Sequence, residues 1–127
     1  MKKAIFLIAL FFTSTSVIAY APVARNDQGV EFFVDFSSIQ KTGNTIRVWE
    51  KQNYPAPRIV GSDFYQSVRI YEEYDCKERK SRRLSWTVFS QKDLSGEVVL
   101  TNSKSSEWNF IAPDSVAGIV MNVVCKK

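Results

Sequence analysis

Residues 30–36 read VEFFVDF, and this stretch decides the fold class. Apolar side chains stand at every even position from Val30 to Phe36, and Glu31 and Asp35 stand between them. A period of two is typical of a β-strand that buries one face and leaves the other facing water. We therefore expect a sheet with one packed side.

The same period continues along the chain after this strand. A second strand is predicted over Ile46–Lys51, and the turn signalled by Thr42-Gly43-Asn44 would join the two as a hairpin. The prolines of Tyr54-Pro55-Ala56-Pro57 interrupt the pattern, and Gly61-Ser62-Asp63 extends the loop expected there. Further strands are predicted over Ser67–Cys76, Leu84–Phe89 and Val98–Leu100.

The period changes near the C-terminus. Five apolar residues fall at i, i+3, i+4, i+7 and i+8, the stripe of an amphipathic helix: Val116, Ile119, Val120, Val123 and Val124. Pro113 suits a first turn, and Asp114 or Ser115 can cap it. Alternation from Ile119 to Cys125 allows a rival strand, but the start signals favour a helix. Because Cys125 lies off the stripe, we expect the last turn to fray or tighten so that its sulfur reaches the sheet.

Residues 1–19 have the features of an export signal. Lys2 and Lys3 form a charged start, and residues 4–12 (AIFLIALFF) form an apolar run too short to span a bilayer. Cleavage is expected after Ala19, which leaves residues 20–127 as one small domain. A short N-terminal anchor is the weaker alternative. No cysteine precedes Cys76, so we expect no lipid anchor.

The net charge does not favour nucleic-acid binding. The whole chain carries a formal charge of +4, and loss of Lys2 and Lys3 with the signal lowers it to +2. An electrostatic attraction of this size is weak and local. We expect no nucleic acid among the partners.

Cys76 and Cys125 are the two cysteines of the chain. In a small exported domain, two cysteines most simply form a disulfide. A zinc site is disfavoured because the sequence has no histidine, and a reactive thiol is disfavoured for the same reason. We expect a structural disulfide, no metal and no cofactor.

Several segments carry a resemblance to a known family. They are VEFFVDFSSI at residues 30–39, Val48-Trp49, SVRIY at residues 67–71 leading to Tyr74-Asp75-Cys76, and APDS at residues 112–115 leading to Val124-Cys125. In these segments the chain resembles the surface-adhesin protein E family. The resemblance implies an α+β fold, a six-stranded antiparallel sheet with a C-terminal α-helix tied to it by the disulfide. It also implies binding of host matrix and plasma proteins, such as vitronectin, laminin and plasminogen, and a homodimer.

Two sets of residues are candidates for partner binding. The first is a basic run between two strands, which could bind an anionic partner or could simply be a solvated turn: Lys77, Arg79, Lys80, Arg82 and Arg83. The second is an aromatic contact surface around Trp49, Tyr71 and Trp86, side chains that more often belong to a core.

Nothing in the sequence predicts catalysis. Glu72, Glu73 and Asp75 lie on one predicted strand, where a charged face in water is a simpler interpretation than a paired-carboxylate hydrolase. Ser37-Ser38 and Ser105-Ser106 have no histidine partner and are interpreted as turn residues. The chain is therefore expected not to be an enzyme.

These observations favour a bacterial protein that works by binding. The leading hypothesis is an exported adhesin-like protein that engages a host matrix protein or another protein or glycan macromolecule. The alternative is a soluble periplasmic structural or inhibitory protein that acts on a bacterial partner. Periplasm, cell surface and extracellular medium all remain open as locations.

Overall fold

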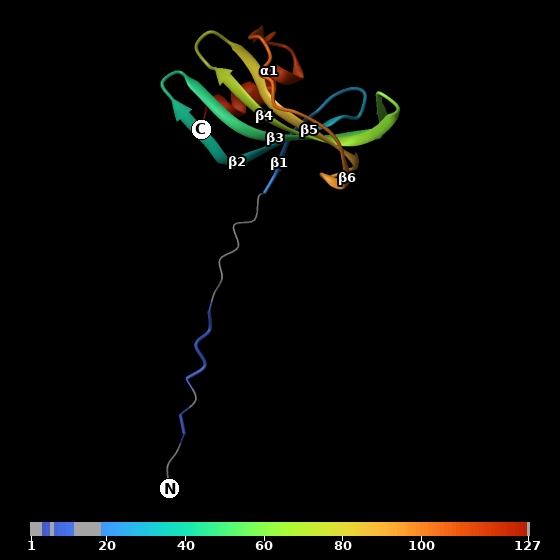
Figure 1. Ribbon diagram of the computed structural model, residues 1–127. Coiled ribbons are helices and arrows are strands. Elements are labelled where there is room, and N and C mark those ends of the chain that lie inside the picture. The colour runs from blue at the N-terminus through green and yellow to red at the C-terminus, as the bar shows by residue number, and fades with distance from the viewer. Residues whose placement is uncertain (1–3, 6, 12–18, 127) are drawn as a thin grey trace.

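The computed structural model describes residues 4–5, 7–11 and 19–126. Alternating sequence produces a curved antiparallel sheet, and one C-terminal helix packs on one side of it (Figure 1). The elements in chain order are β1 (Ala21–Arg25), β2 (Glu31–Thr42), β3 (Thr45–Val60), β4 (Asp63–Asp75), β5 (Lys80–Gln91), β6 (Ser95–Asn102), β7 (Asn109–Phe110) and α1 (Val116–Cys125).

Neighbouring strands in the sequence are neighbours in the sheet. The order is β1-β2-β3-β4-β5-β6, every pair is antiparallel, and the short β7 pairs with β5. The predicted hairpin is present, because Thr42 pairs with Thr45 across a turn in which Gly43 has a φ of +61°. The predicted antiparallel sheet of about six strands with a C-terminal helix is confirmed.

The prediction of a loop from residue 54 to residue 63 is wrong. β3 continues through both prolines to Val60, and a two-residue turn leads into β4 at Asp63. Pairing of β3 with β2 ends at Asn53, and the register with β4 shifts between Asn53 and Arg58. Pro55 and Pro57 therefore lie in a bulge at a free edge, where no ladder needs their missing N–H groups.

The start of the chain differs from expectation in one respect. β1 was not predicted, because its five residues, APVAR, show no clear alternation. It pairs with β2 directly after the expected cleavage point at Ala19.

The predicted signal at residues 1–19 falls largely outside the described residues and stays a prediction. No helix among the residues placed by the structure is long and apolar enough to cross a membrane.

Helix α1 begins at the cap predicted for it. The Ser115 hydroxyl accepts a hydrogen bond from the Gly118 N–H at 3.1 Å. Val120 and Val124 are buried as predicted, and Val116 and Val123 are partly buried, but Ile119 is wrong because it is 47% exposed, whereas Met121, outside the predicted stripe, is only 1% exposed. The packed side of the helix is rotated toward Met121 and Cys125, which lie one turn apart.

Two contacts fix this rotation. The Cys76–Cys125 disulfide, confirmed here, ties the end of the helix to the end of β4. Gly118 is buried so closely against the preceding segment that an added Cβ would lie 2.7 Å from the Ala112 carbonyl oxygen. Because the rotated helix already directs Cys125 at the sheet, the last turn remains α-helical, in contrast to the expected fraying or tightening.

The helix covers only part of its side of the sheet. We call this side the helix face and the opposite side the open face. One apolar cluster joins α1 to Val34, Val48 and Tyr74. A second cluster lies farther along the same face, and its buried members, which include Val68 and Val88, all come from strands or their ends. This uncovered half and the open face are the two surfaces available for function.

Candidate functional site

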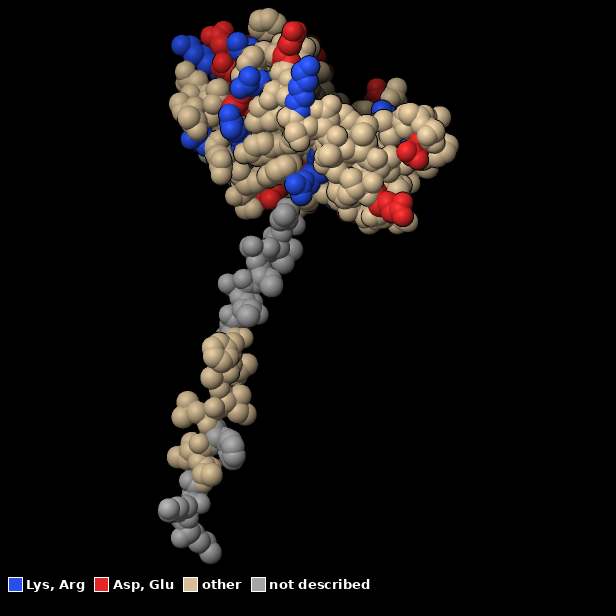
Figure 2. All heavy atoms as spheres, viewed as in Figure 1, with Lys and Arg blue, Asp and Glu red and all other residues tan. Residues whose placement is uncertain are grey.

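The five cations of the basic run do not form one cluster. Lys77 and Arg79 lie in the β4–β5 turn, whereas Lys80, Arg82 and Arg83 belong to β5. Lys80 and Arg82 point to the open face, where both lie over the ring of Trp108. Arg83 points to the helix face. Figure 2 shows positive and negative side chains intermingled at the end of the sheet that holds this turn.

Arg82 forms part of an ion network around a buried carboxylate. Its Nε lies 2.7 Å from Oε1 of Glu73, and the Nε of Arg47 lies 2.8 Å from Oε2 of the same carboxylate. Burial raises the pKa of Glu73, but the two guanidinium groups outweigh it and hold that pKa below its usual value. Glu73 is 4% exposed and Glu72 points to the opposite face, so the expected charged strand face in water is wrong.

The structure brings two of the three candidate aromatics together. Trp49 of β3 and Tyr71 of β4 pair across the ladder with ring centroids 4.5 Å apart. The guanidinium carbon of Arg69 lies 4.1 Å from the centre of the Trp49 ring. Trp86 is separated from them because it packs against the second cluster on the helix face.

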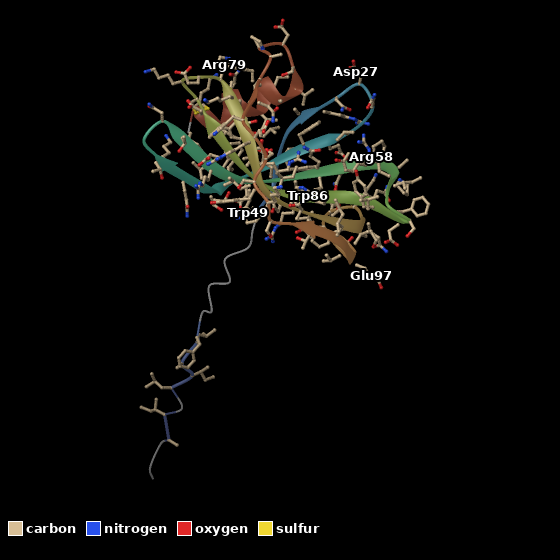
Figure 3. All side chains as sticks on the ribbon, turned by 45° about the horizontal axis from the view of Figure 1, so that its top comes forward. Asp27, Trp49, Arg58, Arg79, Trp86 and Glu97 are labelled. Atoms are coloured by element: carbon tan, nitrogen blue, oxygen red, sulfur yellow. A yellow bond between two sulfur atoms is a disulfide. The ribbon has the colours of Figure 1, made fainter. Side chains whose placement is uncertain are left out.

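Together these side chains form a single surface, which we call the arginine–aromatic patch. It crosses β3, β4 and β5 on the open face and ends at the segment before β7; its residues are Arg47, Trp49, Arg69, Tyr71, Arg82 and Trp108. Figure 3 shows Trp49 near the middle of the sheet and Arg79 at the turn beyond it. Trp, Tyr and Arg are the residue types that dominate binding energy at protein interfaces.

The sequence contained part of this signal. Arg47, Trp49 and Lys51 are spaced two residues apart along one predicted strand, so alternation places Arg47 and Trp49 on the same face. Arg69 was missed although alternation places it on the face of Tyr71, two residues along the same strand, and Trp108 was missed because only the fold of the chain after β6 brings it to the patch. Lys51 has the right parity but is 8% exposed, held by Asp93 at 2.9 Å and by the Phe33 ring.

The described part of the chain offers little for catalysis or metal binding. No group of three or more Cys, Asp or Glu side chains within it is arranged to hold a metal ion. The open face presents cations stacked on aromatic rings, and such a surface can hold a partner by stacking and charge-assisted hydrogen bonds.

The fold and this patch define the chain as a single-sheet α+β domain with a surface of the binding type. The model of the family described as surface-adhesin protein E matches residues 20–126, and the chain belongs to this family. This membership agrees with the resemblance drawn from the sequence.

Solved structures support the fold. A crystal form of Haemophilus influenzae protein E superimposes with a TM-score of 0.67 at 15% identity, over 84% of this chain and 87% of that chain. Protein E from non-typeable Haemophilus influenzae gives a TM-score of 0.56 at 15% identity, over 89% and 79% of the two chains. A search of curated protein sequences finds no match. At this identity the likeness concerns the fold.

Proposed function

We propose that this protein is an exported adhesin that binds a host matrix or plasma protein through the arginine–aromatic patch. Membership of the surface-adhesin protein E family supports the class of function. The observation that carries the choice of surface is the stack of Arg69 on Trp49 beside Tyr71, at 4.1 and 4.5 Å. Stacking holds the guanidinium group in place before binding, which lowers the entropy lost when a partner docks.

The charge of the patch indicates the chemistry of the partner. Arg47, Arg69 and Arg82 contribute three positive charges, and Glu73 contributes one negative charge that two of these arginines already hold. The surface is therefore positive, and it favours an acidic segment of the partner. Binding should weaken as salt rises, because exposed charges are screened over roughly 8–10 Å at physiological ionic strength.

The test compares two arginines of equal chemistry on opposite faces. Arg69 stacks on Trp49 at 4.1 Å, and Arg58 stacks on the Tyr54 ring of the helix face at 4.0 Å. Arg69→Ala should weaken binding to immobilised vitronectin, laminin or plasminogen at least tenfold, and Arg58→Ala should leave it unchanged. Equal losses in both variants, or binding by neither variant nor wild type, would contradict the proposal.

Location distinguishes this function from the periplasmic alternative. Protease accessibility on intact cells indicates a surface protein, whereas exclusive release by osmotic shock indicates a bacterial partner in the periplasm. The expected homodimer stays a prediction, which light scattering of the oxidised protein checks.

A further inference from the structure

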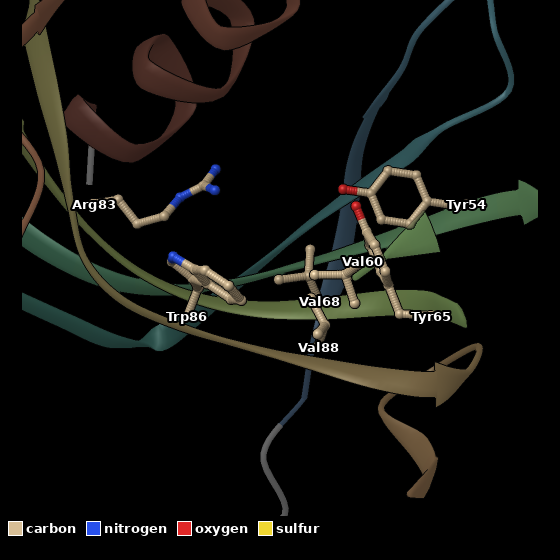
Figure 4. Close-up of a pocket in the computed structure, with 7 residues that line it drawn as sticks. All are labelled: Tyr54, Val60, Tyr65, Val68, Arg83, Trp86 and Val88. Atoms are coloured by element: carbon tan, nitrogen blue, oxygen red, sulfur yellow. The ribbon is translucent and has the colours of Figure 1, made fainter. Parts of the chain in front are cut away.

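The uncovered half of the helix face contains a hollow of about 140 Å³ (Figure 4). Its floor is apolar, because Val68 and Val88 are 4% and 5% exposed. Tyr54 and Tyr65 stand at one end, packed edge to face at 5.5 Å, and Trp86 stands at the other. A typical ligand pocket is several times larger, so this one fits a single compact group.

A β-bulge brings the polar part of this site into place. Tyr71 pairs with Ser85 and Glu72 pairs with Arg83, so Leu84 is an extra residue in β5. Without it Arg83 and Trp86 would point to opposite faces, because their numbers differ in parity. The bulge places both beside the hollow, and Figure 4 shows the Arg83 guanidinium group directed toward it.

The backbone of Arg83 is held on its other side by the segment after β6. Its N–H donates to the Ser106 hydroxyl at 2.9 Å, and the Ser106 N–H donates to its carbonyl oxygen at 2.8 Å. These two bonds fix where the side chain starts. The side chain itself is 44% exposed and can reach a ligand.

The charges around the hollow favour an anion. The carboxylate beside Arg83 is Glu72, whose Oε2 forms an ion pair with Nε at 3.8 Å, a distance that is long for a hydrogen bond. Burial raises the pKa of Glu72, and burial together with the neighbouring Glu72 carboxylate raises the pKa of Glu50 to about 8, so Glu50 adds little negative charge here at neutral pH. At the far end Arg58 lies 4.0 Å over the Tyr54 ring. Positive groups thus stand at both ends of an apolar floor.

We propose that this hollow binds a carboxylate carried by a compact apolar group. The apolar group lies on Val68 and Val88 between Tyr65 and Trp86, and the carboxylate accepts charge-assisted hydrogen bonds from Arg83. A small organic acid and the C-terminal residue of a peptide share this chemistry. The site lies on the opposite side of the sheet from the arginine–aromatic patch, so it can succeed or fail independently of the adhesin function.

The experiment titrates the exported, oxidised protein with matched probes and follows the amide signals of Val68, Trp86 and Val88 by NMR. The probes are 3-phenylpropanoate, its alcohol 3-phenylpropanol, acetate, and the peptide Gly-Gly-Phe with a free or an amidated C-terminus. The acid should bind at least tenfold more tightly than the alcohol or acetate. Arg83→Gln should remove this preference, whereas Arg79→Gln, which alters a neighbouring cation in the β4–β5 turn, should keep it.

The two peptides identify the source of the carboxylate. Tighter binding of the free peptide than of the acid, with loss in the amide, supports a peptide C-terminus, and binding of the acid alone supports a small molecule. Equal binding of acid and alcohol overturns the proposal. So does an unchanged preference in Arg83→Gln with wild-type melting behaviour, or binding by none of the five probes.

Discussion

The Nε of Arg82 lies 2.7 Å from Oε1 of Glu73, a residue that is only 4% exposed. Arg82 therefore contributes to the folded structure as well as to the surface. The same holds for Arg47 on the other oxygen of this carboxylate. A substitution in the basic run can change stability or binding, depending on which of its residues is replaced.

Arg82→Glu should destabilise the protein, and Lys77→Glu should not. The first variant removes a hydrogen bond to a buried carboxylate and places a like charge beside it, at a cost of about 1.5–3 kcal/mol. Lys77 is exposed in the turn. Urea unfolding of both variants measures the difference, and equal midpoints would show that Glu73 does not depend on Arg82.

Loss of the disulfide should strongly destabilise the protein. Cys76 and Cys125 are 49 residues apart, and closing such a loop stabilises by about 4 kcal/mol in the chain-entropy model. Cys76→Ser should lower the melting temperature by more than about 10 °C. Intact mass should rise by about 2 Da when the wild type is reduced. Two free thiols in fresh, unreduced protein would contradict the bond.

Helix packing can be tested with one substitution made at two positions. Val120 is 3% exposed against the sheet, and Asn122 is exposed. Val120→Asp should bury an unpaired charge and largely prevent folding, whereas Asn122→Asp should change the free energy of unfolding by less than about 0.5 kcal/mol. Circular dichroism with thermal melting checks both, and equal tolerance would mean that the helix is turned differently.

Gly118→Ala should destabilise although alanine is the better helix former by about 1 kcal/mol. The new Cβ would lie 2.7 Å from the Ala112 carbonyl oxygen and 2.9 Å from that of Pro113, so the helix would have to move. Asn122→Ala is the control on the exposed side of the same helix. A melting temperature of Gly118→Ala above that of the wild type would show that the helix can shift without loss.

Stability should fall as pH rises from about 5 to 8. Burial raises the pKa of Glu50 from 4.5 to about 8, so in this range the folded protein holds a proton that the unfolded chain has released. The free energy of unfolding then decreases by up to about 1.4 kcal/mol per pH unit. Glu50→Gln keeps an acceptor for the Tyr74 hydroxyl and should flatten this dependence. Urea unfolding midpoints of the wild type and of Glu50→Gln at about pH 5 and pH 8 measure this dependence. The same fall in stability in both proteins would contradict the assignment to Glu50.

Local pattern predicted the strands that pack in the ordinary way. Val30 to Phe36 alternates because one side is packed: Phe32, Val34 and Phe36 lie in the cluster that includes α1, and Val30 lies in the second cluster. β3 beyond Asn53 was not predictable in this way, because the prolines are tolerated only at an edge that the register creates.

The candidate sites depended more strongly on register. Trp49 and Tyr71 pair in a regular part of the ladder, so the alternation of side chains along each strand was enough to predict that they share a face. Arg83 and Trp86 share a face only through the extra residue Leu84, which alternation cannot reveal. The helix was rotated from its predicted stripe because Gly118 and Cys125 set its position through single contacts.

The cystine also has a consequence for proteolysis. β5, β6, β7 and nearly all of α1 lie between Cys76 and Cys125, so they belong to a closed covalent ring. The ring includes the exposed segment at residues 103–107, an accessible place for a protease to cut. One cut there opens the ring without releasing a fragment, since the new C-terminal piece remains bonded through Cys125. The nicked protein would keep its mass, apart from one added water, until a reductant separates the two pieces.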